Sequence, residues 1–308
     1  MNTESSAIPE SFDSPRVAPA AISATRPMYW SVRRELGEYR SIYIAPLAAA
    51  AFFVFGFLIS TIHLPAKMRT ELALGAAQQH QAIAIPYDMA AAFIMGAAFL
   101  VGIFYSLDAL YGERRDRSIL FWKSLPVSDA TTVLAKASIP IVVIPLLAFV
   151  VVVATQCIML LLSSAVLLAS GVGVATLWTQ LGLFQKSLLL LYHLVTVHML
   201  WYAPLYAWML LVSSWAPRAA FLWAFLPPFA ISVVEKIAFN SWQFASMLQS
   251  RVTGGAEAVP VPGQFPMDNM TEITPGRFLS TPGLWIGLGV AAAFLFATMR
   301  IRRRRGPI

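Results

Sequence analysis

Few side chains suited to chemistry occur in this 308-residue sequence, and they lie far apart. His193 and His198 could bind a metal ion or a haem, but their spacing of five puts them about 140° apart on a straight α-helix. They are therefore not expected to hold one metal ion together, although a haem held by one of them with His63 stays an alternative. The sequence has no His-Glu-x-x-His motif and only one cysteine, Cys157. We therefore expect neither a zinc-protease site nor a thiol cluster.

ATP hydrolysis by this chain is not expected either. A phosphate-binding loop needs two glycines ahead of a Lys-Ser or Lys-Thr pair. Lys186 and Ser187 form the nearest such pair, but Gln180 and Gln185 occupy the two glycine positions. The remaining ionisable candidate is Glu235, which lies in an apolar segment and could be a proton site, with an interfacial charge as the alternative. The sequence thus predicts no catalytic residue, no metal site and no bound cofactor.

One segment combines charge, aromatic side chains and a turn, and is the best candidate for a binding surface. Its candidate contact residues are Glu113, Arg114, Arg117, Phe121, Trp122 and Pro126. Pro126 disfavours helix at Leu125, and Ser128 with Asp129 favours the start of a new helix that continues through Lys136. A short helix that carries apolar side chains next to a turn suits the docking of another protein. A solvated charged loop, or side chains lying in the lipid interface, are the alternatives.

The composition places these segments in a membrane protein. Hydrophobic residues make up 58% of the chain and charged residues 12%, with a mean hydropathy of +0.68. A soluble domain carries about 25% charged residues, so a soluble enzyme, a disordered chain and a disulfide-rich secreted module are all disfavoured. An all-α integral membrane protein is expected, because a crossing helix needs about 20 apolar residues. The predicted spans are residues 42–62, 89–107, 137–162, 187–213, 219–239 and 283–299.

The fifth of these spans is the weakest, because Pro227 and Pro228 are expected to interrupt it. The sequence leaves open whether residues 219–250 form a full span or a broken, re-entrant segment. An outer loop follows at residues 240–282. Sixteen of the 22 Lys and Arg residues fall in the N-terminal segment, the loop 108–136, the link after span four and the tail 300–308. Because basic residues gather on the cytoplasmic side, both termini are expected to be cytoplasmic.

The N-terminal segment is expected to contain a helix that lies along the membrane. Residues 1–25 read as a disordered leader, and residues 26–41 as an amphipathic interfacial helix. Tyr29, Val32 and Leu36 share one helical face, while Arg34 and Glu38 lie on the other at a spacing of four. The alternative is an ordinary entry into the first span.

The order of these elements resembles the membrane-spanning permease subunit of type-2 ATP-binding-cassette (ABC) exporters. The resemblance is carried by Glu113, by the stretch from Ser118, and by the Leu125-Pro126-Val127-Ser128 turn ahead of Lys136. Ser118 stands where Thr is more usual, and Phe121-Trp122 is bulkier than common versions. The resemblance implies that the loop 108–136 holds a coupling helix seated in a groove of a separate ATPase subunit. It also implies a dimer of permease chains with the substrate route between them.

The expected function is therefore a permease subunit of an ABC exporter in the bacterial inner membrane. It would work with a separate ATPase that binds ATP and with a second permease chain, would not itself be an enzyme, and would not bind nucleic acid. A membrane scaffold or assembly factor is the first alternative, and a haem or redox protein using His193 or His198 the second. Lipid, drug and peptide substrates fit the sequence equally, as do homodimers and heterodimers.

Overall fold

The computed structural model describes residues 25–124, 127–253 and 273–304, and every regular element in these ranges is a helix. Six helical segments are long and apolar enough to cross a membrane, as the sequence predicts. The chain is therefore an all-α, multi-pass membrane protein. The six segments are Ser41–Glu71, Gln78–Arg115, Asp129–Ala169, Ala175–Trp201, Ala220–Phe239 and Pro282–Arg304.

Most of the helices extend beyond the apolar runs that predict them. Helix α4 (Ala76–Asp108) begins well before residue 89, and helices α7 (Asp129–Ser138) and α8 (Ile144–Ala169) extend the predicted span 137–162 at both ends. Helices α7 and α8 are joined by a π-helical turn, η2 (Ile139–Val143), that contains Pro140. Backbone hydrogen bonds continue a helix whatever the polarity of its side chains, so the apolar run marks only its membrane-compatible part.

The fourth apolar run also contains a π-helical stretch. Helix α10 (Leu183–His193) passes into η3 (Leu194–Trp201) and then into α11 (Ala203–Trp215). A π-helix closes its hydrogen bonds over five residues, and such stretches are rare and often lie at functional sites. This local geometry changes which side chains of the fourth span share a face.

The interruption expected in the fifth span is absent, which corrects the sequence reading: α12 (Ala220–Phe239) is continuous through Pro227 and Pro228. A proline inside a helix leaves the carbonyl four residues earlier without its usual donor. Here the carbonyl of Ala224, four residues before Pro228, accepts a hydrogen bond of 3.0 Å from Nε1 of Trp208 in α11. The neighbouring helix supplies the donor that the proline lacks.

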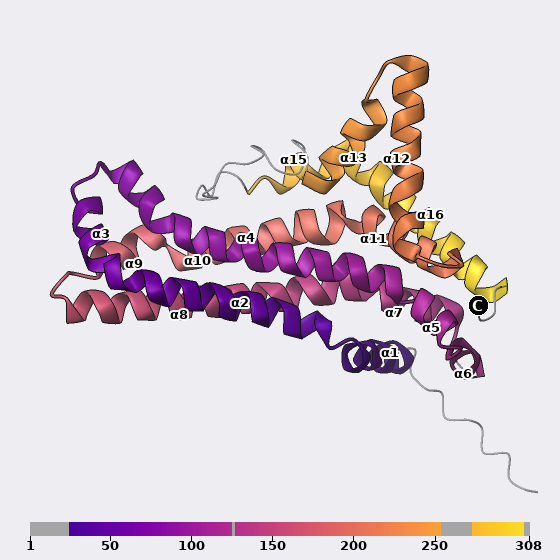
Figure 1. Cartoon of the computed structure of the whole chain (residues 1–308), viewed down its shortest axis with the longest axis horizontal. Helices are drawn as coiled ribbons and strands as arrows, with labels where there is room; N and C mark the ends of the chain where they lie inside the picture. The colour runs from indigo at the N-terminus through magenta and orange to yellow at the C-terminus, as the bar shows by residue number, and fades with distance from the viewer. Residues whose placement is uncertain (1–24, 125–126, 254–272, 305–308) are drawn as a thin grey trace, which may run out of the picture.

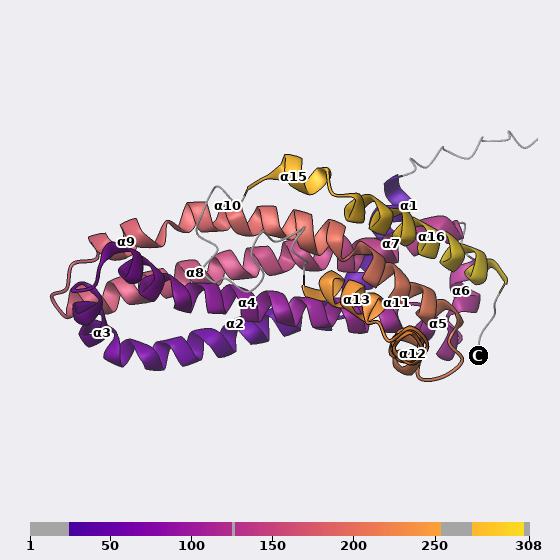
Figure 2. The ribbon, with the colours of Figure 1, turned by 90° about the horizontal axis from the view of Figure 1, so that it is seen from above.

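The long helices α2 (Ser41–Ser60), α4, α8 and α10–α11 run along the long axis of the molecule (Figure 1). Helix α12 stands across that axis, and Figure 2, turned by 90°, shows it end-on. Length and composition qualify α12 as a span, but its direction differs from that of the other long helices. Helix α13 (Gln243–Thr253) returns beside α12, and α15 (Pro275–Leu279) and α16 (Pro282–Arg304) complete the described chain.

The two ends of the bundle carry different short elements. Helices α1 (Thr25–Glu38), α5 (Tyr111–Arg115) and α6 (Ile119–Ser124) gather at one end with the start of α7 and the last turns of α16 (Figure 1). We call this the α6 end. The opposite end carries η1 (Thr61–His63), α3 (Leu64–Glu71) and α9 (Ala175–Leu181). The α6 end therefore brings together the first, second and last of the basic segments counted in the sequence.

Small residues allow the long helices to pack closely. Ala49, Ala98 and Ala148, from α2, α4 and α8, belong to one buried cluster. In α4, a Cβ added at Gly102 would lie only 2.9 Å from the ring of Tyr206 in α11. Close helix contacts through Gly and Ala are the usual means of association in lipid, where the hydrophobic effect between helices is weak.

Candidate docking surface

Helices α5 and α6 form a compact turn between α4 and α7, which we call the α5–α6 segment (residues 111–124). Arg117 lies between the two helices with a φ of 59°, in the left-handed region that non-glycine residues rarely adopt. The chain bends at this point, so α6 is a separate helix from α5. At the far side, Ser128 caps α7 by accepting a hydrogen bond of 3.0 Å from the Thr131 amide, as the sequence predicts.

Helix α5 is held on the end of α11. The hydroxyl oxygen of Ser213 accepts hydrogen bonds from the amides of Leu110 and Tyr111, at 3.0 and 2.8 Å. These are amides at a helix start, which have no partner within the helix. The Arg114 guanidinium donates to the carbonyl oxygens of Ser213 at 3.2 Å and of Ala216 at 2.5 Å. Arg114 is buried and serves as a link to α11.

Glu113 is the centre of a set of ion pairs that joins four helices. Its Oε2 lies 2.7 Å from Nη1 of Arg302 in α16. Its Oε1 lies 3.2 Å from Nζ of Lys136 in α7 and 3.2 Å from Nη2 of Arg34 in α1. Glu113 is only 4% exposed, so these contacts within the chain occupy its carboxylate.

A second buried carboxylate, Glu35, completes the set. Its Oε1 lies 2.8 Å from Nζ of Lys136 and 2.5 Å from Nη2 of Arg34, and its Oε2 accepts a hydrogen bond of 2.8 Å from the hydroxyl of Tyr105. Asp129 pairs with Nε of Arg302 at 3.0 Å. We call these six residues the charge network: Arg34, Glu35, Glu113, Asp129, Lys136 and Arg302.

The charge network contains three acids and three bases, so its charges balance. Balance matters because an unpaired buried charge costs several kcal/mol, on the order of the whole free energy of unfolding. Burial lowers the pKa of Arg34, but the nearby charges of Glu35 and Glu113 outweigh burial and raise it above its usual range. Arg34 therefore stays charged at any physiological pH, and α1, α5, α7 and α16 remain tied together.

Helix α6 rests on the charge network through two of its residues and exposes two others. Ile119 is buried, and the half-buried Trp122 lies under the guanidinium of Arg34, whose Cζ is 3.8 Å from the ring centroid. Leu120 and Phe121 are 59% and 60% exposed, and the ring of Phe121 lies edge-on to Trp122 with 4.9 Å between the ring centroids. Helix α6 is thus a supported helix with an exposed apolar pair at the tip of the molecule.

The structure places the six predicted contact residues in different settings. Arg117 and Phe121 are exposed, and Trp122 is partly exposed. Glu113 and Arg114 are buried in contacts within the chain, and Pro126 lies outside the described residues. Sequence reasoning missed Arg302 as a partner of Glu113 and Glu35 as a partner of Lys136. The lone Lys136 at the start of an apolar run was the available signal. A buried Lys needs a carboxylate, but the sequence does not say which one.

Glu235 has a structural role that the sequence does not reveal. Its carboxylate accepts hydrogen bonds from the hydroxyl of Ser241 at 2.5 Å and from the amides of Gln243 and Phe244 at 2.8 and 2.9 Å. These amides open α13, where a carboxylate satisfies unpaired donors and the helix dipole. The contacts favour a helix cap over the proton site that was considered for Glu235.

The 140° separation expected for His193 and His198 is wrong, because η3 is π-helical. Hydrogen bonds that span five residues bring positions five apart onto the same side, and the two ring centroids lie 5.7 Å apart. Among the described residues, no group of three His, Cys, Asp or Glu side chains is placed to hold a metal ion. The pair instead lines a pocket inside the bundle.

No protein-family model, curated protein or solved structure matches the chain.

Proposed function

We propose that the chain is the permease subunit of an ABC exporter, and that the α5–α6 segment docks on a separate ATPase subunit. The observation that carries the proposal is the combination of an exposed apolar pair, Leu120 and Phe121, with a rigid buried support. A loop whose only role is to set the orientation of the protein in the membrane needs neither an exposed apolar pair nor a rigid support. Exposed apolar side chains that are fixed in place are a common feature of protein-binding surfaces.

The charge network provides a route by which movement of α6 would reach the membrane helices. Trp122 stacks on Arg34, and Arg34 pairs with Glu113. Glu113 in turn contacts Lys136 of α7, which continues through η2 into α8. A displacement of α6 by a partner would therefore push on a helix that crosses the membrane. This is the mechanical property that coupling to an ATPase requires.

The residues of the α5–α6 segment divide into two roles under this proposal. Arg117, Phe121 and the exposed edge of Trp122 contact the ATPase. Glu113 and Arg114 hold the segment in position and do not touch the partner themselves. The chain performs no hydrolysis, because ATP is bound by the partner subunit.

The orientation and assembly belong to the same proposal. The α6 end faces the cytoplasm of a bacterial inner membrane, both termini lie there, and α1 lies along the inner interface. The support is the excess of Lys and Arg in the segments that gather at this end. A second permease chain, identical or related, is expected to cover part of the crosswise α12, which exposes large apolar side chains to lipid or to protein.

Site-specific photocrosslinking tests the docking proposal. The photoreactive residue p-benzoylphenylalanine would replace Phe121 in the full chain within its natural host, and crosslinked products would be identified by mass spectrometry. The matched control carries the same residue at Phe184, an apolar side chain that is 81% exposed in the first turn of α10, which follows α9.

We expect Phe121, and not Phe184, to crosslink to a protein that contains a phosphate-binding loop. Crosslinks from Phe121 to proteins without such a loop would favour a scaffold or assembly factor. Crosslinks to lipid alone would place α6 in the membrane interface and overturn the proposal.

A further inference from the structure

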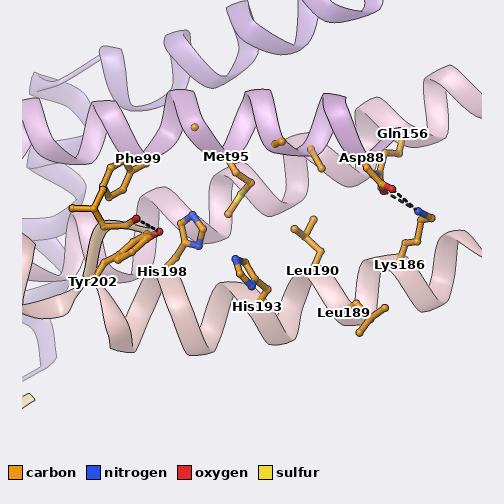
Figure 3. A pocket seen from close by; sticks show the side chains of 14 residues that line it. Asp88, Met95, Phe99, Gln156, Lys186, Leu189, Leu190, His193, His198 and Tyr202 are labelled. Carbon is orange, nitrogen blue, oxygen red and sulfur yellow. Dashed lines mark hydrogen bonds and ion pairs between the residues drawn. The ribbon is translucent and has the colours of Figure 1, made fainter. Parts of the chain in front are cut away.

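A pocket lined by apolar side chains and several polar ones lies inside the bundle, separate from the α5–α6 segment. It is a cavity of about 260 Å³ between α4, α8, α10 and η3, near the lower limit of about 300 Å³ for small-molecule sites. Figure 3 shows the side chains that line it. Its apolar wall includes Met95, Phe99, Leu189 and Leu190. A cavity of this size would normally be filled in a closely packed helix bundle.

Two buried polar atoms of this pocket have no hydrogen-bond partner among the described residues: Oε1 of Gln156 and Nδ1 of His198. The two residues are 3% and 8% exposed. The amide of Gln156 is oriented by its Nε2, which donates to the carbonyl of Tyr87 at 3.2 Å, so Oε1 remains as an acceptor. Buried polar groups are normally paired, and leaving one unpaired costs about 1–3 kcal/mol.

The π-helical stretch η3 is what brings His198 to this pocket. His198 lies 5.7 Å from His193 and 5.2 Å from Tyr202, measured between ring centroids. The hydroxyl of Tyr202 donates to the carbonyl of Val252 at 3.0 Å, so it is already paired (Figure 3). The imidazoles of His193 and His198 therefore remain as polar groups at this end of the pocket, and Nδ1 of His198 is the buried atom that lacks a partner.

Charge argues for an uncharged occupant. Asp88 and Lys186 both line the pocket and pair with each other, with Nζ of Lys186 at 2.8 and 2.9 Å from the two carboxylate oxygens. The charges of Asp88 and Lys186 offset one another. A charged ligand would lose its hydration on entering the pocket and would find no opposite charge that is not already paired. Hydroxyl and amide groups suit the site better, because they can serve an unpaired acceptor and an imidazole nitrogen alike.

We propose that this cavity binds a small uncharged amphipathic molecule whose hydroxyl or amide groups pair with Gln156 and His198. Its apolar part packs against Met95, Phe99 and the leucines of α10. The site is built from one chain alone and contains no residue of the α5–α6 segment. It therefore stands independently of the docking proposal.

Two photoreactive probes test the site in the purified full-length protein in lipid nanodiscs. One is an octanol and the other an octane, each carrying a diazirine on the alkyl chain, so they differ only by the hydroxyl. Labelled residues would be located by peptide mass spectrometry, with unlabelled octanol as competitor. The test variant is Gln156→Leu with His198→Phe. The matched control makes the same two changes outside the pocket, Gln180→Leu with His63→Phe.

We expect the octanol probe to label residues of the pocket wall saturably, and at least fivefold more than the octane probe. The test variant should lose this difference and the control should keep it. If the double variant does not fold, His198→Phe alone should still reduce octanol labelling. Equal labelling by both probes, or unchanged labelling in the variants, would overturn the proposal and leave the cavity to water or lipid chains.

Discussion

At the scale of single residues, this protein places ionised side chains where the sequence shows mostly apolar segments. Glu35 and Lys136 are both almost fully buried and lie 2.8 Å apart. Such a pair adds little net stability compared with apolar residues, but removing one member is costly because the other is left unpaired. The pair favours contact between α1 and α7, because separating these helices would leave both charges without this partner.

The variant Glu35→Gln should show this cost. It removes one carboxylate from beside Arg34 and Lys136, and we expect the free energy of unfolding to fall by about 3 kcal/mol. Glu38→Gln on the same helix is the matched control. Burial, followed by the charge of Glu35, raises the pKa of Glu38. Ionised Glu38 therefore destabilises the folded protein at neutral pH, and this destabilisation disappears as the pH falls and Glu38 is protonated. Neutralising Glu38 should therefore not lower stability.

Thermal unfolding of the purified variants in one detergent, at neutral pH, measures this difference. A midpoint for Glu35→Gln equal to that of Glu38→Gln would show that the charge network does not stabilise the fold.

At the scale of elements, short-range contacts between helices correct what the sequence pattern suggests. Trp208 supplies the donor that Pro228 removes from α12, and η3 brings His198 to a pocket. Arg251 has a similar effect on α13: its guanidinium donates to the carbonyl of Gly283, and its Cζ lies 4.0 Å from the ring centroid of Trp201. One side chain thus ties α13 to both α16 and η3.

The variant Gly287→Ala should weaken the contacts that Arg251 makes with Gly283 and Trp201. A Cβ at Gly287 would lie 2.7 and 2.8 Å from the two Nη atoms of Arg251, so the guanidinium must move. At Gly289, two residues nearer the C-terminus and about 200° around the helix, a Cβ would meet nothing within 4 Å. Gly289→Ala is therefore the control and should stabilise α16 by about 0.5–1 kcal/mol.

Hydrogen exchange measures this effect on α13. We expect the amides of Gln243–Thr253 to exchange faster in Gly287→Ala and at the normal rate in Gly289→Ala. Equal rates in the two variants would mean that Arg251 does not hold α13.

At the scale of the whole molecule, the two ends of the bundle differ in chemistry. The α6 end contains the charge network and the basic segments, whereas the opposite end carries α3 and α9. If basic residues set the orientation, the α6 end must face the cytoplasm. Docking of α6 on an ATPase subunit, as proposed, requires the same orientation, because such a subunit binds ATP in the cytoplasm.

Cysteine labelling tests this orientation. In a Cys157→Ser background, Phe121→Cys should react with a membrane-impermeant maleimide only after the membrane is opened. The position is 60% exposed, so access to its thiol depends on the side of the membrane. Phe121→Cys that reacts fully in intact spheroplasts would place α6 outside the cytoplasm and contradict the docking proposal.

Much of the fold follows from the sequence, for a physical reason. A membrane span is a local property, because about 20 apolar residues in a row satisfy lipid whatever their neighbours are. The number of spanning-length helices, the Ser128 cap and the continuation of α7 toward α8 are all of this kind, and the structure has each of them. Helix bounds differ from the predictions mainly where polar residues extend a helix beyond its apolar run.

Only the tertiary structure decided how the functional side chains are shared among helices. Glu113 and Arg302 are 189 residues apart in the chain and 2.7 Å apart in space, and no local pattern contains that contact. The same holds for Gln156 and His198, whose unpaired atoms line one pocket only because α8 and η3 pack beside α4. Hydropathy and helix propensity act between near neighbours in the chain, whereas ion pairing and cavities depend on which distant segments meet.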